Sequence, residues 1–220
     1  MTWVRFSFCL IVGFYCLQST SLSAQEKSAA ADSYVQVSRE DISAGEKAAN
    51  FGFIYLVQWT GYYVSQESVV RDHGSLKNMR ENITKPHFDK DHFNWNLSKH
   101  TLTGQYYYLF YRSRGYGKQS AFHWSAISSL AFEFAIETAT ERPSYQDIYQ
   151  TPVFGSILGM GTERLSLYLH SLQTVPTTLL GYLLNPFTIL PAPYSAYQIA
   201  WAPMQNGKNK ALALTVGVEL

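Results

Sequence analysis

The sequence predicts a mainly α-helical protein, a compact bundle of about four to six helices with a short C-terminal β-hairpin. Three segments between residues 46 and 141 contain no proline, and the second and third end beside a glycine or a proline, as helices do. Apolar and polar residues alternate with a period of two only toward the end of the chain, which is typical of strands. These observations place the helical domain at residues 46–190 and the hairpin at residues 191–220.

Residues 1–24 have the pattern of a secretory signal peptide. A positive charge at Arg5 precedes an apolar run over residues 6–17, and small residues lead to Ala24. We expect cleavage after Ala24; the alternative is an uncleaved N-terminal anchor. Cleavage would also leave the mature chain without disulfides or thiol chemistry, because the segment contains both cysteines, Cys9 and Cys16.

The composition is poor in charge and rich in aromatic residues. Charged residues make up 15% of the chain, against about 25% in typical soluble domains. Aromatic residues also make up 15%, and sixteen of them are tyrosines. Such a surface suits contact with a membrane or a partner protein, and the alternative is a soluble protein with a large aromatic core. The net charge of +1 gives no basic footprint, so we expect no nucleic-acid binding.

The first part of the mature chain is predicted to contain one helix between two polar segments. Residues 25–45 are small and polar, which predicts a flexible leader. Residues 48–66 carry no charge and are long enough to cross a bilayer, but Asn50 and Gln58 make them a poor membrane span. We therefore expect a buried or interfacial helix there. Residues 67–86 are rich in charges and turn formers, which predicts an exposed connection.

The middle of the chain predicts three further helices. The second extends over about residues 90–112 and the third over about residues 119–141, where Pro143 ends it. Ser144 and Asp147 have the spacing of a capping box, and Thr151-Pro152 is typical of an N-cap followed by a first turn that opens a fourth helix. Gly155 and Gly159 are four apart, which would let the fourth helix come close to another helix, and the predicted structural glycines are Gly104, Gly155 and Gly159.

The end of the chain changes character twice. Residues 165–206 carry no formal charge and are interrupted by five prolines, so no single helix extends through them. Two alternating runs then flank Asn206-Gly207, which is a hairpin turn signal. We expect this hairpin to pack on the helical body or to pair with a protein partner.

A set of carboxylates on the third predicted helix is the strongest candidate for chemistry. Glu133, Glu137 and Glu141 are four residues apart and share one helix face, where like charges repel each other. Apolar neighbours predict that Glu133 is buried, and a buried carboxylate needs a partner or a raised pKa.

The second predicted helix offers partners for these carboxylates. His92, Asn96 and His100 are again four apart, and pairing with the glutamates would form an acid–base centre or a metal site. The predicted catalytic residues are His100, Glu133, Glu137 and Asp147, and the supporting polar residues are Asp89, His92, Asn96 and Glu141. The structural alternative is that Asp89 and Asp147 cap helices, the histidines are satisfied in the core, and Glu163 forms a solvated pair with Arg164.

These motifs, in order, resemble a bacterial cell-envelope family defined as domain of unknown function DUF3943. The resemblance covers about residues 85–190 and departs from the family pattern at Thr101 and at Met160-Gly161, which displaces an acidic residue to Glu163. The residues that match are Asp89-Lys90, Asn96, His100, Gly104, Tyr106-Tyr107, Ser129, Glu133, Glu137, Glu141, Pro143-Ser144, Gln146-Asp147, Thr151-Pro152, Gly155, Gly159 and Asn185-Pro186.

A fainter resemblance links the same region to VanZ-like helical membrane proteins, through Asp89-Lys90, the mid-helix glutamate and the Gly-x-x-x-Gly pair. Both resemblances imply a helical protein of the bacterial envelope, exported across the inner membrane and associated with a membrane in the periplasm or at the outer membrane. Neither implies a reaction or a cofactor, and metal binding stays open.

Two functions are compatible with these patterns. The first is an uncharacterised envelope protein with a structural or partner-binding role, which uses the hairpin to dock. The alternative is an envelope hydrolase that acts on a lipid or glycan through a His/Glu acid–base or metal centre. An enzyme requires a pocket that reaches the His/Glu face, whereas a structural polar lock requires that face to be closed.

Overall fold

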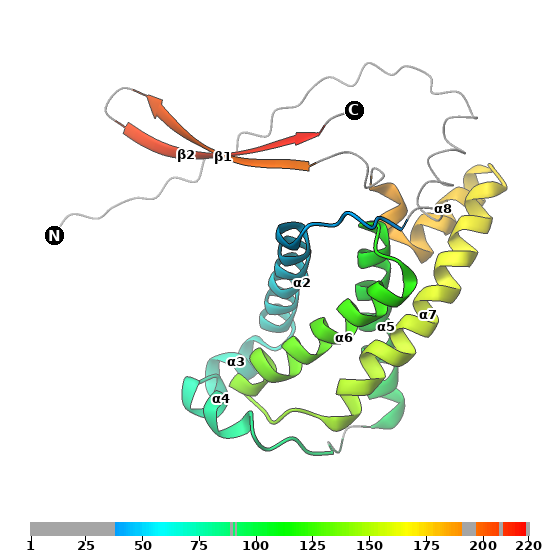
Figure 1. Cartoon of the computed structure of the whole chain (residues 1–220). Coiled ribbons are helices and arrows are strands. Elements are labelled where there is room, and N and C mark those ends of the chain that lie inside the picture. The colour runs from blue at the N-terminus through cyan, green and yellow to red at the C-terminus, as the bar shows by residue number, and fades with distance from the viewer. Residues whose placement is uncertain (1–37, 89, 91, 191–196, 207–208, 219–220) are drawn as a thin grey trace.

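The structure is a computed structural model that describes residues 38–88, 90, 92–190, 197–206 and 209–218 (Figure 1). The predicted signal peptide, most of the predicted leader and Asp89 lie outside the described residues. Over residues 38–190 the chain is almost entirely helical, which confirms the predicted class. The helices are α2 (Ala44–Ser65), α3 (Glu67–His73), α4 (Leu76–Asn82), α5 (Phe93–Ser113), α6 (Lys118–Ala135), η1 (Glu137–Ala139), α7 (Tyr145–Ser171), α8 (Val175–Leu184) and η2 (Pro186–Ile189), where η marks a 3-10 helix.

The described residues contain seven α-helices, more than the four to six expected. The difference comes mainly from residues 67–86, which form the short helices α3 and α4 instead of an irregular connection. Ser75 accounts for the second of them, because its hydroxyl accepts a hydrogen bond from the Asn78 N–H at 3.0 Å and so caps α4. A charged, turn-rich segment can therefore still form short helices of about two turns, and one of the two has a side-chain cap.

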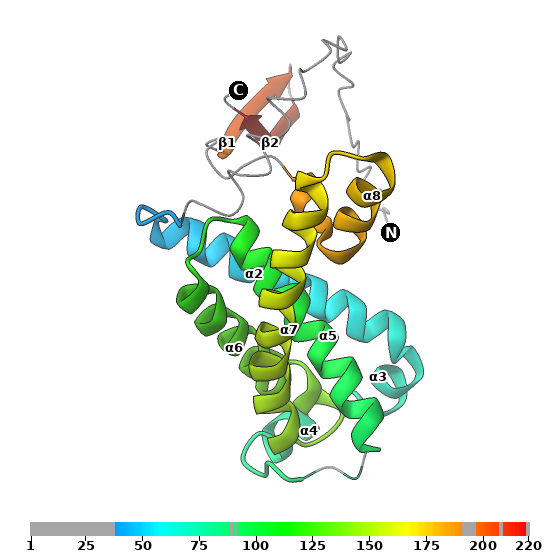
Figure 2. The same ribbon diagram turned by 90° about the vertical axis from the view of Figure 1, so that its right-hand side faces the viewer.

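Helix α5 lies at the centre of the body. It packs lengthwise against α7 and also contacts α6, and Figures 1 and 2 show these three helices side by side. Its residues from Tyr107 to Tyr111 are all buried, so this stretch has neighbours on every side of the helix. The Phe110 ring stacks on Phe53 of α2 at 5.3 Å and meets Phe187 of η2 at 5.8 Å. Some of the aromatic residues of the sequence thus form the core around α5, while others are exposed.

Two glycines allow the backbones of α5 and α7 to touch. A Cβ atom on Gly104 would lie 1.7 Å from the Thr151 carbonyl oxygen, and one on Gly155 would lie 2.4 Å from the Gly104 Cα. Side chains at either position are therefore excluded, as the spacing of small residues predicts. The contact also places His100, one turn before Gly104, beside Thr151, one turn before Gly155.

Helix α7 begins at the capping box and not at Thr151-Pro152. The Ser144 hydroxyl accepts a hydrogen bond from the Asp147 N–H at 3.4 Å, which confirms the predicted cap. The predicted helix start at Thr151-Pro152 is wrong, because α7 continues through Pro152 to Ser171. Proline removes the hydrogen bond to the Ile148 carbonyl, and the packing of this long helix along α5 and α6 outweighs that loss.

The third predicted helix is shorter than expected. Helix α6 ends at Ala135 and is followed by the 3-10 turn η1, so Glu137 and Glu141 are not on a continuous α-helix with Glu133. The β-branched residues that follow favour this break. The Thr138 hydroxyl donates to the Phe134 carbonyl and the Thr140 hydroxyl donates to the Glu137 carbonyl, and both bonds compete with regular helix.

Helix α2 has its polar side turned toward the protein. Its buried residues recur every fourth position, and two of the four, Asn50 and Gln58, are polar; the other two are Ile54 and Tyr62. The Gln58 side-chain amide donates to the Ser128 carbonyl at 2.9 Å, and Asn50 donates to the Tyr116 hydroxyl at 3.2 Å. Large apolar side chains face outward instead, with Leu56 64% and Val64 74% exposed.

The predicted leader is too long at its C-terminal end. Ile42 is buried in the core, and the Arg39 N–H donates to the Gly115 carbonyl at 2.8 Å. Arg39 also forms a salt bridge with Glu46 at 2.7 Å, while the Ser43 hydroxyl caps α2. Gly115 adopts a positive φ of 86°, which suits glycine at the end of α5.

Strands β1 (Tyr197–Asn206) and β2 (Asn209–Val218) pair antiparallel, from Tyr197 opposite Val218 to Asn206 opposite Asn209. The side chains of these strands lie outside the described part of the chain, as does the predicted turn residue Gly207. The role of this segment in docking stays a prediction.

Candidate functional site

Helices α5, α6 and α7 bring three predicted site residues together. His100, Glu133 and Asp147 each have a possible metal-ligand atom within 4.8 Å of the other two. All three residues are buried, with exposed fractions of 7%, 1% and 6%. Residues up to 47 positions apart in the sequence thus converge at one point inside the bundle.

His100 is held through both ring nitrogens. Its Nε2 lies 3.3 Å from the Asp147 Oδ2, and its Nδ1 is 3.0 Å from the Thr151 hydroxyl. The close contact of α5 and α7 at Gly104 sets these distances, because it fixes the two helices one turn away. These contacts hold the imidazole ring of His100 in one orientation and one position.

Glu133 and Glu137 form a buried carboxyl pair with raised pKa values. Burial raises the pKa of Glu133 to about 7, and the negative charge of Asp147 adds to this rise. The Ser144 N–H opposes the rise, because it donates a hydrogen bond to the Glu133 Oε2 at 3.0 Å. The pKa of Glu137 lies well above its usual value, first through burial and then through the charges of Glu133 and Glu141. The pair therefore retains a proton at neutral pH.

These shifts predict that stability falls as the pH rises. A carboxyl whose pKa is raised in the folded protein contributes its full stabilisation when the pH is below 4.5, its pKa in the unfolded chain. For Glu133 this stabilisation is lost as the pH rises through about 7, its pKa in the folded protein. We expect urea unfolding, measured with a chelator present, to give a free energy of unfolding lower at pH 8 than at pH 5 by on the order of 3 kcal/mol.

The variant Glu137→Gln replaces a buried carboxyl of raised pKa by a side chain that does not titrate, so it should flatten this dependence. Glu40→Gln is the control because Glu40 is exposed near the start of the described chain. A wild-type protein that is as stable at pH 8 as at pH 5 would contradict the proposed carboxyl pair.

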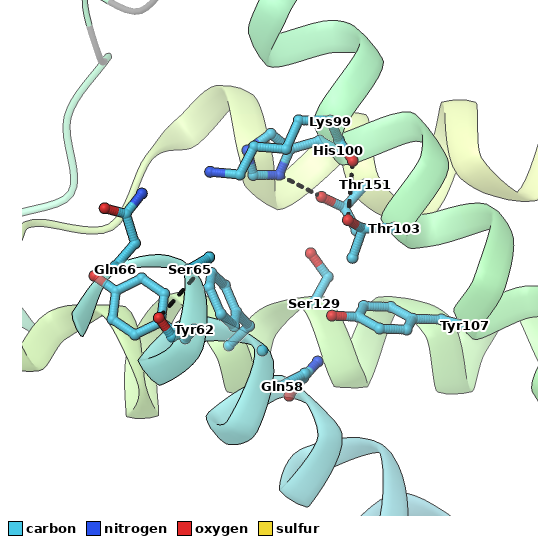
Figure 3. Close-up of a pocket in the computed structure, with 12 residues that line it drawn as sticks. Gln58, Tyr62, Ser65, Gln66, Lys99, His100, Thr103, Tyr107, Ser129 and Thr151 are labelled. Carbon is cyan, nitrogen blue, oxygen red and sulfur yellow. Dashed lines mark hydrogen bonds between the residues drawn. The ribbon is translucent and has the colours of Figure 1, made fainter. Parts of the chain in front are cut away.

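A cavity of about 180 Å³ opens beside His100. Helix α2 contributes Gln58 and Tyr62 to its wall, and α5 contributes Lys99 and Tyr107 (Figure 3). Ser129 and Thr151 line it next to His100, so the cavity reaches the edge of the polar centre. The Gln58 Oε1 is buried and accepts no hydrogen bond from the described residues. A small polar molecule could therefore find a hydrogen-bonding partner in this cavity.

The other predicted site residues are placed differently. Asn96 is buried one turn before His100, and Glu141 is exposed but close enough to raise the pKa of Glu137. His92 is exposed at the N-cap position of α5, because the helix starts at Phe93 and not near residue 90. The predicted face therefore contains one buried imidazole, that of His100, together with the buried Asn96.

A buried ion pair was missed by the sequence reasoning. The prediction that Glu163 forms a solvated pair with Arg164 is wrong, since Glu163 is 2% exposed and accepts a hydrogen bond from Arg112 Nε at 2.8 Å. Arg112 also donates to the Tyr116 carbonyl, and its side chain is 5% exposed. The sequence does contain one signal for this ion pair, since Arg112 ends the aromatic run YYYLFYR. A cation on a buried helix needs an acidic partner.

The fold and the site together define a helical-bundle protein with a buried His–carboxyl centre. The sequence profile of the family described as Domain of unknown function (DUF3943) matches residues 85–187, which confirms the resemblance over that segment. The matched segment includes α5, α6, α7 and α8, and hence every residue of the His100 centre. Searches of curated proteins and of solved structures found no match. The similarity to VanZ-like proteins stays a prediction.

Proposed function

We propose that this chain is a bacterial cell-envelope protein whose helical body rests against a membrane through the outward face of α2, in a structural or partner-binding role. The observation that carries this proposal is the inverted orientation of α2. In a helix at a water-facing surface, the apolar side packs on the core and the polar side faces solvent. In α2 the polar residues Asn50 and Gln58 are buried, and Leu56 and Val64 are exposed.

The outward face of α2 consists of side chains that suit a lipid surface. It exposes five large residues without a charge among them, and they are Phe53, Leu56, Val57, Tyr63 and Val64. Burial of a valine or leucine side chain contributes about 1.5–3 kcal/mol, so a bilayer surface would stabilise this face where water does not. Tyrosine suits the boundary between acyl chains and headgroups.

The distribution of charge around α2 supports the same surface. No charged residue occurs from Ala48 to Gln66, whereas Glu46 and Lys47 precede this stretch and Glu67 follows it. Polar ends and an uncharged middle are expected where a helix meets lipid along its length. In the described part of the chain, no helix combines the length and apolar character required to cross a membrane. The bacterial envelope as location rests on the predicted signal peptide and the family resemblance.

Vesicle flotation tests this surface directly. We expect the variant Leu56→Gln/Val64→Gln to reduce the vesicle-bound fraction at least tenfold, because it removes two apolar contacts of this size. The matched control is Leu76→Gln/Ile83→Gln, which changes exposed apolar residues of α4 and its C-cap, among charged neighbours. Equal flotation of both variants would overturn the proposal, and so would a wild-type protein that does not float.

An envelope hydrolase that acts on a lipid or glycan is the second candidate function. The observation in its favour is that a cavity reaches His100, because a purely structural set of buried polar residues would need no cavity beside it. Within this candidate, the Glu133 and Glu137 pair would exchange protons and His100 would orient the reacting group. Turnover of a lipid or glycan ester that Glu133→Gln abolishes, while the fold persists, would select this candidate over a purely structural role.

A further inference from the structure

We propose that His100, Glu133 and Asp147 bind one divalent transition-metal ion, for which zinc is the best match. This site goes beyond the proposed membrane contact and does not depend on it. The three residues come from α5, α6 and α7, and their ligand atoms lie within 4.8 Å of one another. One imidazole and two carboxylates are a ligand set of the kind that zinc and related metals use.

The separation of two of these ligand atoms matches a metal site better than a hydrogen bond. Bond lengths of about 2.0–2.1 Å to a tetrahedral zinc place neighbouring ligand atoms about 3.3 Å apart. The His100 Nε2 and the Asp147 Oδ2 are 3.3 Å apart. A charge-assisted hydrogen bond between them would be shorter, at about 2.7–2.9 Å. The pair is therefore spaced as two ligands of one ion.

The surrounding contacts orient each group as a ligand. In the tautomer in which the Nδ1–H of His100 donates to the Thr151 hydroxyl at 3.0 Å, the Nε2 on the Asp147 side carries the lone pair that a metal would bind. The Ser144 N–H donates to the Oε2 of Glu133, and the Ser144 hydroxyl accepts from the N–H of Asp147. One capping residue thus positions both carboxylate ligands.

The charge of the centre also favours a cation. Glu133, Glu137 and Asp147 are all buried within the same part of the bundle. Arg112 and Glu163 already neutralise each other at 2.8 Å. Buried carboxylates need protons, cations or metals to balance them, and an ion with two positive charges would do so in one step.

The cavity is lined by one of the three proposed ligands, His100. Its volume of about 180 Å³ exceeds the roughly 30 Å³ that a water molecule occupies in the liquid. A catalytic metal site keeps one position open for water or substrate, and a cavity lined by Ser129 and Thr151 would serve that position.

Metal content and thermal stability test the site. The protein is purified without an affinity tag from cells that express the full chain, and its metals are measured by mass spectrometry. We expect about one zinc per chain in the wild type, and at least a tenfold lower content in His100→Ala and in Asp147→Asn. The matched controls are His92→Ala and Glu141→Gln, which remove an exposed imidazole and an exposed carboxylate and should retain the metal.

A second readout keeps the proposal testable where a variant fails to fold. After chelation, added Zn²⁺ should raise the Tm of the wild type by several degrees, because an ion that binds only the folded state stabilises it. The Tm of folded Asp147→Asn should not change. Wild-type protein that contains no metal and whose Tm responds to neither Zn²⁺ nor Mn²⁺ would overturn the proposal, as would full metal content in His100→Ala.

Discussion

Gly104→Ala is expected to lower the free energy of unfolding by about 3 kcal/mol or more, the upper end of what overpacking usually costs. The new Cβ would lie 1.7 Å from the Thr151 carbonyl oxygen, an atom of the α7 backbone that cannot rotate away. Helices α5 and α7 would have to separate, which would also displace His100 from Thr151. For a chain of this length the expected fall in Tm is about 6–12 °C, measured by circular dichroism.

Gly161→Ala is the matched control for this prediction. It lies on α7 like Gly155, but a Cβ atom there meets no atom within 4 Å. Alanine at an exposed helix position stabilises by up to about 1 kcal/mol relative to glycine, so the Tm should stay the same or rise. If both variants had the same Tm, the close approach of the two helix backbones would be wrong.

Glu163→Gln is expected to cost about 3–5 kcal/mol, because it leaves the Arg112 guanidinium buried without its counter-charge. The two side chains are 5% and 3% exposed and 2.8 Å apart, so water cannot replace the lost carboxylate. Urea unfolding of the variant beside the wild type measures this difference. The double variant Arg112→Met/Glu163→Met should recover part of the loss, since it removes both charges.

The control for the ion pair is Glu67→Gln. Glu67 and Arg71 form an exposed pair at 3.9 Å, and such pairs contribute about 0.3–0.5 kcal/mol. A loss below 1 kcal/mol in Glu163→Gln would show that Arg112 reaches water or another acid.

Local signals predicted much of the fold. Gly115 and Pro143 follow helical segments, and Ser144 caps α7 as its spacing with Asp147 indicates. The wrong boundaries have different causes: local hydroxyl-to-carbonyl hydrogen bonds accompany the early end of α6, whereas packing overrides a local signal at Pro152. Pro152 is tolerated within α7 because of the contacts of that helix with α5.

The candidate site was predictable in part. Burial of Glu133 follows from its apolar neighbours, and His100 meets it because Gly104 and Gly155 fix the two helices that hold His100 and Asp147. Arg112 and Glu163 are 51 positions apart, and no local pattern joins them. Asn50 and Gln58, which share one side of α2, were visible in the sequence, but only tertiary packing decides that this side faces inward.

The most direct test of membrane association is the binding of wild-type protein to vesicles of phosphatidylcholine, a zwitterionic lipid without net charge, with and without NaCl at about 0.5 M. An apolar contact through α2 predicts that the protein floats with the vesicles and that the bound fraction is the same in salt, because salt at about this concentration screens charge interactions but does not weaken apolar burial. Protein that stays in the bottom fraction, or that salt releases from the vesicles, would contradict membrane association through the outward face of α2.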